Sequence, residues 1–141
     1  MGFISRILVP TDFSTNAEKA LQFALRLAAE CGASLHLLYV DDDPILNAPT
    51  TGDEFRNKFD DRMATMLASL LDDDKRMTFH TEYAIARGDA ALEIVKYASS
   101  HEIDLIAIGF KGRSALADIL LGSVANKVVH KASCPVVSVR G

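Results

Sequence analysis

Short runs of hydrophobic residues alternate along this chain with longer segments in which hydrophobic residues recur every three or four positions. The short runs predict strands, and the longer spacing predicts helices. Five strands are predicted, at residues 6–10, 34–40, 77–84, 104–109 and 135–140. The first and fourth are continuously apolar, as expected of strands buried on both faces of a parallel sheet, whereas the third alternates, which indicates an edge strand.

Four helices are predicted between these strands. The first runs from about Asn16 to Cys31; Thr15 followed by Glu18 fits a capping box at its start, and Gly32 fits its end. Its predicted core face consists of Ala17, Ala20, Leu21, Ala24, Leu25 and Ala28. The other three helices are indicated by apolar stripes, which we interpret as core faces, within residues 55–70, 91–98 and 124–132.

Strict alternation of strand and helix predicts one α/β domain over residues 1–141, with a doubly wound parallel sheet and right-handed crossovers. By analogy with other such sheets, we expect the strand order 3-2-1-4-5. Ligands of these sheets bind at the carboxyl ends of the strands where the order reverses, here between strands one and four. The long connection over residues 41–53 is either a lid or contact surface, or a mobile excursion without a role.

The composition of the chain argues against several classes of protein. The chain has 141 residues, 49% hydrophobic and 24% charged, with a net charge of −4, which gives no field to attract nucleic acid or an anionic membrane surface. Two distant cysteines argue against a disulfide framework, and no apolar run approaches the length of a membrane span. No secretory signal pattern opens the chain, so we expect a cytoplasmic protein.

The stretch GFKGRSALADILLGS, residues 109–123, follows the fourth strand directly. Glycines let backbone N–H groups approach an anion, and the helix that opens at Gly122 and Ser123 offers unpaired N–H donors to a phosphate. Lys111 and Arg113 add positive charge, and Ser114 adds a hydroxyl group. The stretch matches neither a P-loop nor GxGxxG, so a plain glycine-rich surface loop and a helix-capping Ser123 stay open as alternatives.

Asp12 follows the first strand, in the sequence PTDFS. A carboxylate at this position is suited to accept hydrogen bonds from ribose hydroxyls or to hold a metal that bridges phosphates. It would also be favourable simply as a negative charge near a helix N-terminus. Its place at the switch point favours the functional interpretation.

The spacing G-x2-G-x9-G-S, together with ILVPTDFS and the closing segment LLGSVANKVVHKASCPVVSVR, resembles the universal stress protein family in its ATP-binding branch. The resemblance covers nearly the whole chain and implies a five-stranded parallel α/β fold, ATP binding and dimers. It further implies that Pro10, Thr11 and Asp12 meet the adenosine end and that Val40 lines the adenine pocket. The phosphates would be wrapped by Gly109, Phe110, Lys111, Gly112, Arg113, Ser114, Ala115, Gly122, Ser123, Val124 and Ala125.

This sequence departs from the family at two of these positions, where the family commonly has His in place of Lys111 and a small residue in place of Phe110. Lysine still pairs with phosphate as a point charge, but it does not replace a neutral imidazole. The four histidines lie on different elements without the spacing of metal ligands.

The sequence thus predicts an ATP-binding stress-response regulator that takes ATP with Mg²⁺ or Mn²⁺. The alternative is a slow Mg-dependent ATPase, for which no convincing general base is apparent; Asp118 is the nearest carboxylate in the loop. A phosphoacceptor receiver domain is set aside, because Phe13 follows Asp12 and the third strand ends without a carboxylate. The resemblance implies a homodimer formed through the last strand, Pro135 to Arg140, which should be an apolar sheet edge.

Overall fold

The computed structural model describes residues 3–111 and 121–140. Its sheet has five strands in the order β3-β2-β1-β4-β5, and all neighbouring pairs are parallel. The predicted fold class and strand order are therefore confirmed, with β3 and β5 at the two edges. The strands are β1 (Arg6–Thr11), β2 (Ser34–Asp41), β3 (Thr81–Arg87), β4 (Leu105–Gly109) and β5 (Val136–Val139).

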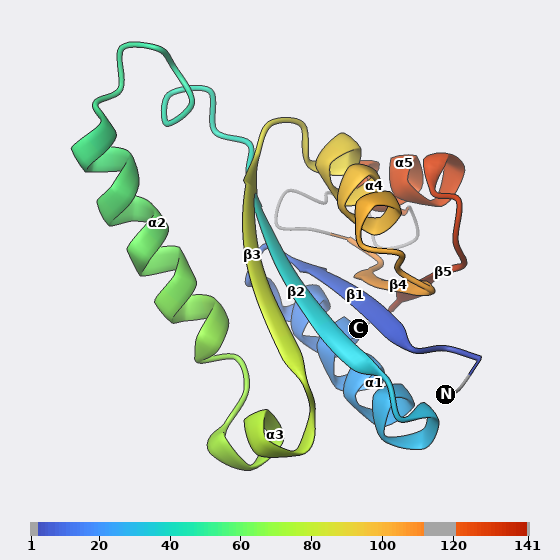
Figure 1. Cartoon of the computed structure of the whole chain (residues 1–141). Coiled ribbons are helices and arrows are strands. Elements are labelled where there is room, and N and C mark those ends of the chain that lie inside the picture. Colours follow the sequence, from blue (N-terminus) through green and yellow to red (C-terminus); the bar gives the residue numbers. More distant parts are fainter. Residues whose placement is uncertain (1–2, 112–120, 141) are drawn as a thin grey trace.

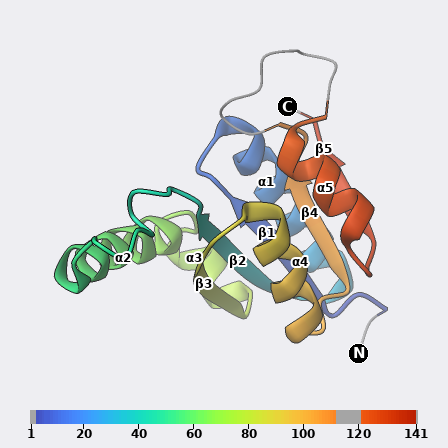
Figure 2. The same cartoon turned by 90° about the horizontal axis from the view of Figure 1, so that it is seen from above.

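Helices cover both faces of the sheet (Figures 1 and 2). α1 lies on one face, and α4 and α5 lie on the other, while α2 leans away from the sheet beyond the β3 edge. The four predicted helices are α1 (Thr15–Cys31), α2 (Asp53–Ala68), α4 (Ala90–Ser100) and α5 (Ser123–Lys131). A further short helix, α3 (Asp73–Thr78), precedes β3.

Each face of the sheet has its own hydrophobic core. Side chains of β1, β2 and β4 meet α1 and the end of α2 on one face, with Leu21, Leu25 and Leu67 among the buried residues. The alternate side chains of the same strands meet α4 and α5 on the other face, around Ile94 and Val128. Because consecutive strand residues point to opposite faces, the continuous apolar runs of β1 and β4 serve both cores. All six residues predicted for the core face of α1 are buried.

The structure corrects the sequence analysis at two element boundaries. Ser14, not Thr15, is the N-cap of α1: its backbone is extended and its hydroxyl accepts a hydrogen bond from the N–H of Ala17 at 3.2 Å. The third strand begins at Thr81 rather than at residue 77, because the Asp72 side chain caps α3 and thereby holds the preceding residues in a helix.

The predicted core stripe of α2 is only partly buried. Met63 and Leu67 are buried, whereas Phe55 is 58% exposed and Met66 36% exposed. The tilt of α2 brings only its C-terminal half against the sheet, which accounts for the exposure of Phe55 (Figure 1).

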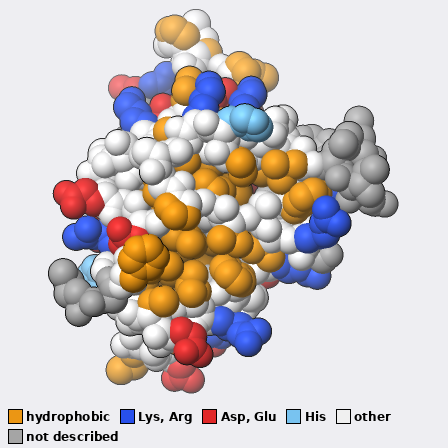
Figure 3. Space-filling model, turned by 90° about the vertical axis from the view of Figure 1, so that its right-hand side faces the viewer, with side chains coloured by type: hydrophobic (Ala, Val, Ile, Leu, Met, Phe, Trp, Pro, Cys, Tyr) orange, Lys and Arg blue, Asp and Glu red, His pale blue; other side chains and the backbone are white. Residues whose placement is uncertain are grey.

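Hydrophobic side chains also gather on the face of the molecule that carries β5 (Figure 3). β5 is an edge strand with three half-buried valines. The helices α1 and α5, which contact β5, each carry an exposed hydrophobic side chain, Phe23 and Val129 respectively. Over residues 3–111 and 121–140, no helix has the length and apolar character needed to cross a membrane.

Candidate functional site

The carboxyl ends of β1 and β4 separate at the switch point of the sheet. These two strands pair only near their beginnings, Ile7 with Leu105 and Leu8 with Ile106. Beyond these pairs no ladder connects them, whereas β1 stays paired with β2 as far as Thr11. In open α/β sheets such a divergence creates the crevice in which ligands bind.

On the α1 face, this crevice is closed. A Cβ atom added to Gly109 would lie 2.8 Å from the carbonyl carbon of Asn16 and 3.0 Å from the nitrogen of Ala17. Both atoms belong to the backbone of the first turn of α1, so they have little freedom to move. Gly109 is therefore needed for close contact between β4 and α1, and its φ is not positive.

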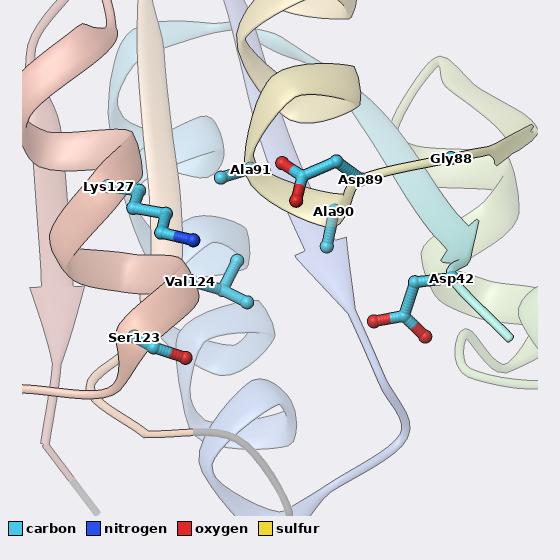
Figure 4. A pocket seen from close by; sticks show the side chains of 8 residues that line it. All are labelled: Asp42, Gly88, Asp89, Ala90, Ala91, Ser123, Val124 and Lys127. Atoms are coloured by element: carbon cyan, nitrogen blue, oxygen red, sulfur yellow. The ribbon is translucent and has the colours of Figure 1, made fainter. Parts of the chain in front are cut away.

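On the α4/α5 face, the carboxyl ends of the strands open into a cavity of about 340 Å³, within the usual size range of ligand sites (Figure 4). Its walls come from three separate parts of the chain: the residue after β2, the turn from β3 into α4, and the first turns of α5. The lining residues are Asp42, Gly88, Asp89, Ala90, Ala91, Ser123, Val124 and Lys127.

Two helix N-termini border this cavity, and they differ in their capping. The Asp89 side chain caps α4 and accepts a hydrogen bond from the N–H of Leu92 at 3.0 Å. The N-cap of α5 is Gly122, which has no side chain to accept from the first-turn N–H groups. The partial positive charge of α5 therefore faces the cavity without a capping carboxylate of its own, whereas that of α4 is already compensated.

The charged side chains of the cavity also differ between its walls. Lys127 lies one turn after Ser123 on α5, and its amine extends into the cavity (Figure 4). The Asp42 carboxylate enters from the opposite wall, and Asp89 lies beside the start of α4. One wall is thus cationic and the other anionic.

The turn at Gly88 shapes the anionic wall. Gly88 has φ +131°, a conformation that side-chain-bearing residues rarely adopt, and its N–H donates to the carbonyl oxygen of Asp41 at 3.1 Å. The buried Asp41 carboxylate lies 3.8 Å from Nε of Arg87, whose guanidinium also forms two hydrogen bonds, of 3.0 and 2.6 Å, with Asp60 of α2. These ion pairs fasten α2 and the ends of β2 and β3 to the rim of the cavity.

The predicted phosphate loop is held together at its base. The N–H of Gly122 donates to the carbonyl oxygen of Phe110 at 2.8 Å, and the N–H of Phe110 donates to Val139 at 2.8 Å. The Arg140 guanidinium lies 4.3 Å from the centre of the Phe110 ring, a cation–π contact. Phe110 therefore joins the start of α5 to the ends of β4 and β5.

The end of β1 forms a tight turn. Thr11 Oγ1 accepts from the N–H of Phe13 at 2.9 Å, and Asp12 Oδ1 accepts from the N–H of Ser14 at 2.9 Å. Phe13 itself has φ +64°, a strained conformation for a residue with a side chain, and its ring packs against Tyr39 at 5.4 Å between centroids. The ring of Phe13 thereby belongs to the hydrophobic core on the α1 face.

The structure brings the predicted site residues together in part. Val40, Val124 and Ala125 belong to the hydrophobic core on the α4/α5 face, and Ser123 and Val124 line the cavity. Pro10, Thr11 and Asp12 lie at the end of β1, and Gly109, Phe110 and Lys111 lie at the end of β4 and just after it. The predicted residues Gly112, Arg113, Ser114 and Ala115 lie outside the described residues, as does Asp118.

Sequence reasoning missed six of the eight cavity residues. Two signals could have found some of them. Asp89 stands three residues before Leu92 at a helix start, which marks an N-cap, and Lys127 stands four residues after Ser123, on the same helix face. Asp42 carries no such local signal. It belongs to a run of three aspartates, and the sequence does not indicate which of the three faces the cavity.

A cluster of aromatic rings lies on the α4/α5 face near the amino ends of the strands, away from the cavity. His36, on β2, is only 3% exposed, and its Nδ1 shares a 2.7 Å hydrogen bond with the hydroxyl of Tyr97. The ring of His101 stacks on Tyr97 at 3.7 Å, and Glu82 lies 3.7 Å from Nε2 of His36. Burial lowers the pKa of His36 below its ordinary value, although Glu82 opposes this shift.

The sequence matches the Universal stress protein family over residues 4–140. It is 34% identical to "Universal stress protein MJ0531" of Methanocaldococcus jannaschii over 140 residues, covering 96% of this chain and 81% of that protein. It is 32% identical to "Universal stress protein YxiE" of Bacillus subtilis, covering 96% and 99% respectively. The chain therefore belongs to the universal stress protein family.

Solved structures agree with this assignment. The structure of MJ0577, another M. jannaschii protein, superposes with a TM-score of 0.80 at 30% identity, covering 97% of this chain and 96% of that one. Two more distant structures share the fold and were solved with nucleotides. The universal stress protein of Archaeoglobus fulgidus in complex with dAMP has a TM-score of 0.66 at 24% identity and covers 98% of each chain. A universal stress protein in complex with cAMP has a TM-score of 0.67 at 22% identity and covers 96% of each chain.

Proposed function

We propose that this protein is an ATP-binding stress-response regulator whose nucleotide occupies the cavity at the switch point between β1 and β4. The single observation that carries the proposal is the cavity on the α4/α5 face, bordered by the N-terminus of α5 and by the ends of β2 and β3. Phosphate groups fit beside Ser123 and Val124, where first-turn N–H groups and the helix dipole favour an anion.

Two further facts support a nucleotide as the ligand. The Val40 side chain packs in the core on the α4/α5 face and provides an apolar surface near the carboxyl end of β2, as an adenine ring requires. Two proteins of the same fold were solved with the nucleotides dAMP and cAMP. Pro10, Thr11 and Asp12 are proposed for the adenosine end, and residues 109–115 and 122–125 for the phosphates.

A divalent cation fits this site only together with the nucleotide. Among the residues of the described ranges, no group of three His, Cys, Asp or Glu side chains is arranged to hold a metal ion. Mg²⁺ usually keeps several waters and binds through phosphate oxygens with one or two protein oxygens. The Ser123 hydroxyl, on the wall proposed for the phosphates, is the side-chain oxygen that the cavity offers to such a cation.

We further propose that β5 pairs with β5 of a second subunit to form a homodimer. The strand is a sheet edge with half-buried valines, and exposed hydrophobic side chains gather on its side of the molecule (Figure 3). An edge of this kind favours pairing with another strand unless it is covered. Sedimentation equilibrium at micromolar concentration should give twice the mass of one chain; a monomer would contradict this pairing.

The alternative, a slow ATPase, needs a carboxylate that orients water at the phosphates. Of the two carboxylates that line the cavity, Asp89 is engaged in capping α4, and Asp42 lies on the wall opposite α5. This arrangement favours binding over turnover. Release of inorganic phosphate, measured on the same sample as nucleotide binding, distinguishes the two.

The central test compares substitutions at two glycine N-caps. Gly122 and Gly52 cap α5 and α2 with nearly the same backbone conformation, φ −59° with ψ 153° and φ −70° with ψ 150°. Gly122→Asp places a carboxylate where the phosphates would lie, whereas Gly52→Asp adds the same cap at a helix far from the cavity. By calorimetry with Mg²⁺ and ATP, Gly122→Asp should weaken binding at least about a hundredfold, and Gly52→Asp should bind as the wild type does.

Two results would overturn the proposal. The first is a wild-type protein that neither releases an adenine nucleotide on denaturation nor binds ATP. The second is equal ATP affinity in the wild type and in a folded Gly122→Asp variant.

A further inference from the structure

We propose that the opposed charges of Lys127 and Asp42 fix the direction in which the nucleotide lies in the cavity. Lys127 would then be the residue by which the site favours triphosphates over monophosphates. The inference rests on the proposed function, since it concerns the ligand of the same cavity. Neither residue belongs to the glycine-rich stretch or to the turn after β1.

The first step is the position of Lys127 on α5. It lies four residues after Ser123, so both side chains project from the same face of the helix. Helical side chains lean toward the N-terminus, which carries the amine back toward the first turn of α5 (Figure 4). A phosphate that accepts from the first-turn N–H groups would leave the next phosphate within reach of this amine.

The second step is that no carboxylate in the described residues neutralises Lys127. None of the ion pairs found within 4.0 Å involves it. Lys131, one turn later on α5, does not line the cavity. The cavity therefore holds one cationic side chain among the described residues, on the wall where the helix dipole is also positive.

The third step is the facing wall. Asp42 and Asp89 would repel a phosphate, and the α4 N-terminus is already capped, so the phosphates are excluded from this side. An Asp42 carboxylate instead accepts a hydrogen bond from an N–H or O–H donor. The nucleoside offers two such donors, a ribose hydroxyl and the exocyclic amine of adenine, and the charges therefore place the nucleoside toward Asp42.

The two side chains should consequently affect different parts of the ligand. Lys127 contacts the phosphates beyond the first, so its effect should grow with the number of phosphates. Asp42 contacts the nucleoside, so its effect should be the same for ATP, ADP and AMP. This difference separates directed binding from a general change in the charge of the cavity.

The experiment measures the Kd of ATP, ADP and AMP by calorimetry at constant Mg²⁺ and ionic strength. Lys127→Gln should raise the Kd of ATP about tenfold and that of AMP no more than about twofold, because a charge-assisted hydrogen bond to the outer phosphates is lost. Lys131→Gln removes the same charge from the same helix outside the cavity, and should leave all three values unchanged.

Asp42→Ala should raise the Kd of all three nucleotides by the same factor, about fivefold. Asp61→Ala, which removes an exposed carboxylate of α2, is its control. Titration of the wild type and of Asp42→Ala with 2′-deoxy-ATP and with inosine triphosphate then identifies the donor. The analogue that lacks the contacted group should bind both proteins equally.

Three outcomes would overturn the inference. The first is that Lys127→Gln weakens the binding of ATP and of AMP by the same factor, and the second is that it binds all three nucleotides as Lys131→Gln does. The third is that Asp42→Ala tightens the binding of ATP but not of AMP, which would place the phosphates on the wall of Asp42. In these cases the wild type still binds ATP, so the proposed function is unaffected. A wild type that binds none of the three nucleotides would contradict both the proposed function and this inference.

Discussion

The two faces of the sheet differ most at the point where β1 and β4 separate. On the α1 face, the backbone of the first helical turn lies so close to Gly109 that no Cβ atom fits between them. On the α4/α5 face, a cavity of about 340 Å³ with charged walls lies between the end of β2, the turn from β3 into α4 and the start of α5. A switch point therefore does not by itself define a site, because only one of its two faces accommodates a ligand.

The difference arises from how each helix begins. α1 begins directly after the tight turn of β1 and is capped by Ser14, so its first turn rests on the sheet. α5 begins at Gly122, whose N–H is bonded to Phe110, and its first turn faces the cavity. The α1 face is closed by the contact between the first turn of α1 and Gly109. On the other face, the first turn of α5 has no side-chain cap and leaves N–H donors available for an anion.

The largest expected effect tests the closed face. Gly109→Ala should lower the free energy of unfolding by about 3 kcal/mol, because the new methyl group overlaps backbone atoms of α1 that cannot move without displacing the helix. Urea denaturation of the variant and the wild type measures it. Gly52→Ala is the matched control, since a Cβ atom there meets nothing within 4 Å.

A Gly109→Ala protein as stable as the Gly52→Ala control would show that α1 does not close this face as tightly as described. The claim that the α1 face is closed and the α4/α5 face open would then be wrong.

A smaller effect tests the two helix N-termini at the cavity. Asp89→Ala should cost about 1 kcal/mol of stability, since the N–H of Leu92 loses its acceptor. ATP affinity should not decrease, because the substitution removes a negative charge and exposes N–H donors. Thermal unfolding and calorimetry on one sample measure both quantities, with Asp61→Ala as the control. A strong loss of ATP affinity would assign Asp89 to ligand binding instead of capping.

The smallest expected effect is a pH dependence of stability. It concerns the cluster of His36 and Tyr97 on the α4/α5 face, near the amino ends of the strands. Burial lowers the pKa of His36, so the unfolded chain takes up a proton more readily than the folded one. Stability is therefore fully present above the ordinary pKa of histidine, about 6.5, and is lost as the pH falls through the lowered value. The groups facing His36 are Glu82 and His80 of the β3 side, Tyr97 and His101 of the α4 side, and Arg6 of β1.

Urea denaturation at pH 7.5 and 5.5 measures this dependence. The wild type should lose more stability on acidification than His36→Gln, and the excess should be small because Glu82 partly compensates the charge. In the described part of the chain, His36 is the one buried histidine, so this loss is specific to the α4/α5 face. Equal losses in the two proteins would show that His36 takes up its proton without cost in the folded state.

The sequence alone determined the elements and their order. The six buried residues of α1, the apolar runs of β1 and β4, and the alternation of strand and helix depend on neighbours a few positions apart, and such local patterns predict buried faces. Local patterns failed at the start of α1 and at α3, where neighbouring polar residues compete for the same cap. The proposed roles of the glycine-rich stretch and of Lys111 stay predictions.

Only the tertiary structure decided which side of the switch point is open and which charges meet there. Asp42, Asp89 and Lys127 come from separate segments, and each has an ordinary local role as a turn residue, a cap or an exposed helix position. Likewise, the side of Gly109 on which a Cβ atom would lie faces the backbone of α1, a contact that the spacing of the glycines does not reveal. The physical reason is that these contacts depend on how helices pack across the sheet, which no short sequence window contains.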